Sequence, residues 1–145
     1  MPIPASNPLY FANAVAEVQA DAEGYAVMRW QPGARPLAQY QEAMNALLRV
    51  IRALGTGKAL VDHLHISGFS EEEKHWIATN WLPRAVVQGN YRYAALLARP
   101  DTMAWLLLAD QQQFDWPQAP TVQLFTDEAN ARQWLREQVV VDSQI

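Results

Sequence analysis

Segments that are apolar at every position alternate along this chain with longer segments of helical periodicity. Residues 59–61 and 94–98 are continuously apolar, which is typical of strands buried on both faces of a parallel sheet. Before the first of them, apolar residues recur at steps of three and four, which places them on one helical face: Leu37, Tyr40, Met44, Leu47, Ile51 and Leu54. Strands that alternate with helices predict an α/β domain with a single mixed, mostly parallel sheet.

The rest of the pattern predicts five strands, in the order ββαβαβαβα. Residues 9–19 and 25–30 enclose a turn at 20–24, so we expect them to form an N-terminal antiparallel hairpin. Further strands, parallel to the strand at 25–30, are expected at 58–62, 92–98 and 121–125.

Local signals predict where the helices begin and end. Ser70 and Glu73 have the spacing of a capping box, so a helix should begin there. Pro83 cannot donate to the carbonyl of Thr79, which predicts a kink or break between these residues, and Gly89 should end the helix. The other helices are expected from Leu37 to Leu54, from Pro100 to about Gln112 and from Thr126 through Leu135.

The length of 145 residues is near the usual size of one domain. We expect an extended arm at 1–8, one domain at 9–138 and a tail at 139–145. The longest apolar runs, 94–98 and 103–109, are far shorter than the ~20 residues of a membrane-spanning helix. Residues 1–8 contain three prolines and do not resemble a secretion signal. We therefore predict a cytoplasmic protein that does not span a membrane.

The composition excludes several kinds of chemistry. The chain has no cysteine, which excludes disulfides, thiolate metal sites and cysteine nucleophiles. Its formal net charge is −4, and its 11 basic and 15 acidic residues are scattered along the chain. Nucleic-acid binding normally needs a basic face, so we expect no nucleic-acid partner.

Polar residues gather in the 62–70 loop, between a buried strand and a helix: Asp62, His63, His65 and Ser67. In wound α/β sheets the loops at the carboxyl ends of the strands converge, and ligands bind there. This loop is therefore our candidate site for a ligand or partner. Asp62 is the first choice because it directly follows a buried strand, although it can instead hydrogen-bond its own loop.

Two other chemistries are open for this loop. If the strand extends, His63 and His65 share a face and can chelate zinc, but a third ligand is needed and His75 is the only other histidine. A loop serine can act as a nucleophile beside a histidine and Asp62, but the chain has no Gly-x-Ser-x-Gly elbow. We predict no metal, no cofactor and no catalytic residue.

A second candidate region lies in the helix that follows. Trp76 and Trp81 are five residues apart, so about 140° separates them around a helix and they do not easily face the same core. One of them can line a pocket or an interface near Trp105, or both can be buried along a kinked helix. Arg84 can bind an anion or a lipid headgroup, or be solvated. We include Trp76, Trp81 and Arg84 among the candidate binding residues.

Gly55-Thr56-Gly57-Lys58 looks like the end of a phosphate-binding loop. That motif follows a strand, continues with serine or threonine and opens a helix. Here a helix precedes the glycines, Ala59 takes the place of the hydroxyl residue and a strand follows. We therefore predict a structural turn from a helix into a strand.

Five blocks of sequence carry a resemblance to a known family: Val27-Met28-Arg29-Trp30, Ala59-Leu60-Val61-Asp62, Ser70 with Trp76-Ile77, Trp81-Leu82-Pro83-Arg84-Ala85-Val86, and Leu124-Phe125-Thr126-Asp127 with Ala131 and Trp134-Leu135. From about Leu9 to Leu135 the chain resembles the SpoIIAA-like (STAS-type) proteins, in particular their stand-alone bacterial branch. The resemblance implies a β-α superhelix, shared with the CRAL-TRIO lipid-carrier domains, and a non-enzymatic role. Some STAS modules are switched by phosphorylation in an Asp-Ser-Ser/Thr-Gly-like loop. In this chain only Ser67-Gly68 matches that motif, without its upstream Asp-Ser.

Three functions remain, in decreasing order of preference. The first is a non-enzymatic regulatory or protein-interaction module of the STAS type. The second is a small-ligand or lipid-binding carrier, and the third is a small hydrolase that uses the 62–70 loop. We expect a protein partner or a small ligand, with a homodimer as a further option, and no enzyme activity.

Overall fold

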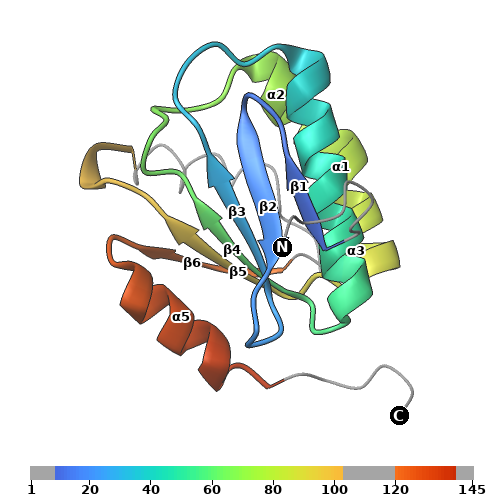
Figure 1. Cartoon of the computed structure of the whole chain (residues 1–145), viewed down its shortest axis with the longest axis vertical. Coiled ribbons are helices and arrows are strands. Elements are labelled where there is room, and N and C mark those ends of the chain that lie inside the picture. The colour runs from blue at the N-terminus through green and yellow to red at the C-terminus, as the bar shows by residue number, and fades with distance from the viewer. Residues whose placement is uncertain (1–8, 103–119, 140–145) are drawn as a thin grey trace, which may run out of the picture.

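The computed structural model describes residues 9–102 and 120–139, which form a mixed sheet with helices on both faces (Figure 1). Its six strands are β1 (Tyr10–Ala12), β2 (Ala16–Ala20), β3 (Ala26–Trp30), β4 (Lys58–Asp62), β5 (Tyr93–Leu97) and β6 (Thr121–Phe125). They lie side by side in chain order. The pairs β1–β2 and β2–β3 are antiparallel, and the pairs from β3 to β6 are parallel. The predicted α/β class and the four parallel strands are confirmed.

The N-terminal segment differs from the prediction. Residues 9–19 were expected to form one strand, but they contain β1 and β2, so the described sheet has six strands rather than five. Asn13 causes the reversal: its side-chain Oδ1 accepts from the backbone N–H groups of Val15 and Ala16, at 3.0 and 3.1 Å. Such a turn competes with continued strand geometry, and the asparagine was its only sequence signal.

The helices are α1 (Leu37–Leu54), α2 (Glu71–Trp76), the π-helical turn η1 (Ile77–Trp81), α3 (Leu82–Gly89) and α5 (Glu128–Glu137). Helix α1 matches the predicted range and ends at Gly55, whose φ of 76° is left-handed. Helices α1 and α3 pack together on one face of the sheet, and α5 covers the other (Figure 1). Residues 100–102 are helical, and the rest of the helix expected to reach Gln112 lies outside the described residues.

The helix does not break between Thr79 and Pro83 as predicted, but its hydrogen bonding changes in the π-helical turn η1. The N–H of Leu82 bonds to the carbonyl of Ile77, five residues back, where a regular helix would bond four residues back. Pro83 lies in the first turn of α3, directly after η1.

Helix α3 ends at Gly89, as predicted, but Gly89 is not the residue with left-handed geometry. Asn90 takes the left-handed conformation, with φ 53°, and donates its N–H to Ala85. Gly89 is instead a point of close packing, since an added Cβ would lie 3.1 Å from Leu48 and 3.2 Å from Ile51 on α1. The small residue lets α3 approach α1.

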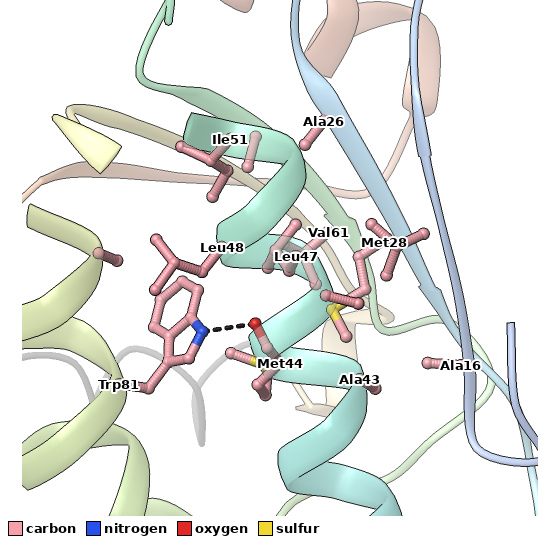
Figure 2. Close-up of a cluster of buried hydrophobic side chains, with 14 of the residues drawn as sticks. Ala16, Ala26, Met28, Ala43, Met44, Leu47, Leu48, Ile51, Val61 and Trp81 are labelled. Atoms are coloured by element: carbon pink, nitrogen blue, oxygen red, sulfur yellow. Dashed lines mark hydrogen bonds between the residues drawn. The ribbon is translucent and has the colours of Figure 1, made fainter. Parts of the chain in front are cut away.

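Two apolar layers enclose the sheet, because successive side chains of each strand face opposite sides. The layer below α1 includes Met28, Val61 and Trp81, whose indole N–H donates to the Met44 carbonyl (Figure 2). The layer below α5 contains Val27, Leu60, Leu97, Ala131 and Leu135. Among the described helices, none is long and apolar enough to cross a membrane. The expected arm at 1–8 and the tail beyond residue 139 lie outside the described residues.

Candidate functional site

The candidate site lies at the carboxyl ends of β3, β4 and β5, around residues 63–70, which we call the 63–70 loop. Strand β4 ends at Asp62, so the alternation of side chains determines where the first polar residues point. Asp62 follows Leu60 toward α5, whereas His63 follows Val61 toward the α1 side, where its ring meets Phe69. The two leading candidates therefore lie on opposite faces of the sheet.

Asp62 is buried, with 4% of its surface exposed, and both its carboxylate oxygens have protein partners. Oδ2 accepts from Arg29 at 2.9 Å, and Oδ1 accepts from the backbone N–H of Leu64 at 2.9 Å. The carboxylate thus joins β3 to the first residues of the loop. This is the structural role that the sequence left open beside a binding role.

Arg29 connects Asp62 to helix α5. Its guanidinium also bonds both carboxylate oxygens of Glu128, at 2.9 and 3.2 Å. Glu128 in turn accepts from Arg132, which reaches Asp21 at 2.9 Å. The hydrogen bond to Glu128 raises the pKa of Arg29, and the hydrogen bond from Arg29 lowers the pKa of Glu128. This network links helix α5 to β3, to the end of β4 and to Asp21.

This network was not predicted from the sequence. One local signal for it is the spacing of Glu128 and Arg132, which are four residues apart on a helix. Arg29 interrupts an otherwise apolar strand, and that also indicates a buried partner.

His63 is buried, with 6% of its surface exposed, and its ring meets that of Phe69 edge to face with the centroids 5.7 Å apart. Its backbone N–H donates to Leu97 on β5 at 2.8 Å. Its ring nitrogen Nδ1 is buried and has no hydrogen-bond partner among the described residues. Burial lowers the pKa of His63 from 6.5 to about 4, so the imidazole is neutral near pH 7.

His65 and Ser67 are exposed. The N–H of Ile66 bonds to the carbonyl of His63 at 3.3 Å, which closes a turn and points Ile66 into the core. Because the strand has already ended, His63 and His65 do not share a face, and the chelating pair considered above does not form. In the described ranges, no group of three or more His, Asp or Glu side chains could hold a metal ion.

Two arginines fasten the 63–70 loop to the domain through its carbonyl groups. Arg35 donates to the carbonyl of Gly68 at 2.8 Å, and Arg99 makes a longer hydrogen bond of 3.5 Å to the carbonyl of Ile66. These two carbonyls flank Ser67 on either side. Ser67 is therefore exposed on a segment that is held at both of its neighbours.

Glu73 is the second anchor of the loop. Arg35 bonds both its carboxylate oxygens, at 2.6 and 2.8 Å, and the N–H of Ser70 donates to it at 2.7 Å. Ser70 Oγ accepts from the N–H of Glu73 at 3.1 Å, which confirms the predicted capping box. Burial acts to raise the pKa of Glu73, but the hydrogen bonds from Arg35 and Ser70 outweigh it and hold this pKa below its usual range.

An aromatic cluster lies beside this anchor. Trp30 and Tyr40 stack with their centroids 5.4 Å apart, and Tyr40 and Trp76 meet edge to face with their centroids 5.8 Å apart. The guanidinium carbon of Arg35 lies 4.9 Å from the Phe69 centroid. A cation of the chain itself, Arg35, therefore lies against the aromatic cluster.

The second candidate region separates into one core residue and two more accessible ones. Trp81 is buried, and its indole N–H donates to Met44 at 2.6 Å (Figure 2). Trp76 is half-buried, and the guanidinium carbon of Arg84 lies 6.0 Å from its ring centroid. Arg84 also donates to the side-chain oxygens of Asn45 and Asn80. Trp105, the third residue of the pocket hypothesis, lies outside the described residues.

The 55–58 segment is a structural turn, as predicted. Gly57 has φ 73°, and an added Cβ would lie 2.2 Å from the carbonyl oxygen of Asn90. Its own carbonyl accepts from the N–H groups of Arg92 and Tyr93. Lys58 is buried and donates to the carbonyl of Leu135 at the end of α5, and burial lowers its pKa.

Comparisons with protein-family models, with curated proteins and with solved structures find no significant match to this chain. The resemblance to STAS-type proteins therefore stays a prediction.

Proposed function

We propose that this chain is a non-enzymatic regulatory or protein-interaction module of the STAS type, acting in the cytoplasm of a bacterium. Its recognition surface is the 63–70 loop, where His65 and Ser67 face solvent. The observation that carries this proposal is the attachment of the loop by Arg35 and Arg99 on either side of Ser67. A loop held in one conformation loses little entropy when it binds a partner.

The other polar groups of the region support binding rather than catalysis. Asp62 is occupied by Arg29 and Leu64, and Glu73 is occupied by Arg35 and Ser70. Asp62 and His63 lie on opposite faces of the sheet, so they do not form the acid–base pair that a hydrolase of this loop needs. The groups left facing solvent on the loop are recognition groups.

The arrangement of the sheet also favours this proposal. The resemblance implies a sheet wound by successive β-α units, and four neighbouring parallel strands in chain order with an antiparallel N-terminal hairpin are consistent with it.

Site-specific photocrosslinking in the host cell tests the proposal. Ser67 is replaced by p-benzoylphenylalanine, and in a matched control the same residue replaces Val87, which is 83% exposed on α3. Helix α3 ends beside the start of β4, at the opposite end of the sheet from the loop. We expect a discrete protein adduct at position 67 and none at position 87. No protein adduct at position 67, or the same adduct at both positions, would contradict the proposal.

The second candidate function is a carrier of a small ligand or lipid. One observation favours it: the Nδ1 atom of His63 is buried, close to the aromatic cluster, without a partner in the part of the chain that the structure describes. Native mass spectrometry of the chain purified from its own host separates the two functions. A retained mass of a few hundred daltons would support the carrier, whereas the bare chain mass together with the position-67 adduct supports the interaction module.

A further inference from the structure

We propose that protonation of His63 releases the 63–70 loop from the body of the domain under mildly acidic conditions. Loop opening is a property of the isolated chain, so this inference does not depend on the partner or on the proposed function.

The geometry around the imidazole favours its neutral form. His63 is 6% exposed, packs against Phe69 of the same loop, and has no partner for Nδ1 among the described residues. A neutral imidazole loses one hydrogen bond in such a place, whereas an imidazolium carries a full charge with no acceptor at Nδ1. The protonated ring must therefore reach water.

The charged groups around the ring do not compensate that charge. Asp62 on β4 attracts it, but this carboxylate faces the other side of the sheet and is bonded to Arg29. Arg35, between β3 and α1, repels it, and the one carboxylate that α2 places nearby, Glu73, is bonded to Arg35. Strand β5 contributes the carbonyl of Leu97, and the carbonyl of Val61 acts in the same direction. These are the charged and polar groups that the described residues place around His63.

The opposing influences on the pKa of His63 determine the pH range in which the loop opens. Burial is the largest influence, Arg35 adds to it, and together they lower the pKa of His63 from 6.5 to about 4 against the opposing groups. The open state binds a proton at the ordinary pKa and the closed state does not, so the closed state is favoured above about pH 6.5 and loses that advantage as pH falls toward 4. As pH falls, the loop should open at a higher pH than that of general acid unfolding, because the pKa values of Glu73 and Glu128 are lowered from 4.5.

Exposure of this ring requires movement of the whole loop. His63 opens the loop, and Phe69, near its other end, packs on the ring of His63 and on those of Trp30 and Tyr40. Outward rotation of the imidazole removes the Phe69 contact. The His63–Phe69 contact thus joins the two ends of the loop, in addition to the hydrogen bonds from Arg35 and Arg99.

Hydrogen–deuterium exchange of the full chain, corrected for intrinsic exchange rates, measures the opening. The reporter amides are those of Leu64, Ile66 and Ser70, which the closed loop protects by hydrogen bonds. From the two pKa values, the open-to-closed ratio should rise about 30-fold between pH 7.5 and pH 5. Amides in the middle of α1 should keep their protection over this range.

Two variants separate His63 from other titrating groups. His65→Asn removes an exposed histidine of the same loop and should retain the whole pH response. His63→Phe keeps an aromatic ring against Phe69 without a titrating nitrogen and should abolish the response. A wild-type loop whose protection does not change, or an equal change in His63→Phe, overturns the proposal.

Proton NMR of the wild-type histidine rings keeps the test decisive if His63→Phe does not fold. We expect the His63 ring to remain neutral down to pH 5 in molecules whose loop amides are protected. A His63 ring that titrates near pH 6.5 while these amides stay protected would equally overturn the proposal.

Discussion

Arg35 and Glu73 form a two-point ion pair at the base of the 63–70 loop, with Nε–Oε2 and Nη2–Oε1 distances of 2.6 and 2.8 Å. The side chains are only 14% and 5% exposed. Arg35 also donates to Gly68, and Glu73 accepts from Ser70. The pair therefore joins the start of α1, the loop and the start of α2 into one unit.

Arg35→Leu should destabilise the fold by about 2–3 kcal/mol, measured as the free energy of unfolding in urea at pH 7. Breaking a fully buried pair costs about 3–5 kcal/mol, and Glu73 keeps its hydrogen bond from Ser70 here. The exposed Arg49→Leu on α1 is the matched control and should stay within about 0.5 kcal/mol of wild type.

The pH dependence of this loss gives a second check. The lowered pKa of Glu73 means that its contribution to stability is present above its usual pKa of 4.5 and is lost as pH falls through the folded value. The difference between wild type and Arg35→Leu should therefore narrow below about pH 4. A difference that stays constant from pH 7 to pH 3 would show that the ion pair is not its source.

Asp62→Asn should reduce stability and leave partner binding unchanged. Asp62 is occupied by Arg29 and Leu64, and loss of a hydrogen bond to a charged group costs about 1.5–3 kcal/mol. Asp101→Asn, at an exposed aspartate, is the control and should cost less than about 0.5 kcal/mol. Chemical unfolding and the yield of the position-67 adduct measure the two properties. Unchanged stability with lost binding would place Asp62 in the site itself.

Gly57→Ala should destabilise the domain by about 3 kcal/mol or more, measured by thermal unfolding. The residue combines a φ of 73° with a 2.2 Å contact between the new Cβ and the carbonyl oxygen of Asn90. Gly33→Ala provides the comparison, because Gly33 also has positive φ, at 110°, but has open space around it. Its cost should be about 1 kcal/mol, from backbone strain alone. Equal losses in the two variants would rule out the close approach as the cause.

The elements that depend on local signals could be predicted from the sequence. The periodicity of α1 and the capping box of Ser70 depend on residues within one or two turns, and the structure agrees with both. The turn at Asn13 and the left-handed cap at Asn90 were missed, because each depends on one asparagine that other contexts tolerate equally well.

The candidate site was only partly predictable for a different reason. The carboxyl end of β4 was expected from the strand pattern, but the faces of Asp62 and His63 depend on the residue at which the strand stops. Arg35 pairs with a residue 38 positions away, and Arg29 with one 99 positions away. Such contacts arise from strand order and helix placement, which a single sequence does not encode as a local pattern.

The most direct test of the recognition loop is the affinity for the protein captured at position 67, measured by isothermal titration calorimetry. The double variant His65→Ala/Ser67→Ala removes two exposed side chains of the loop and should weaken binding at least tenfold, about 1.4 kcal/mol or more. Ser70→Ala is the control: it loses the helix cap and about 1 kcal/mol of stability, and should keep its affinity within about twofold. Unchanged affinity in the double variant, or lost affinity in a folded Ser70→Ala protein, would contradict the assignment of recognition to His65 and Ser67.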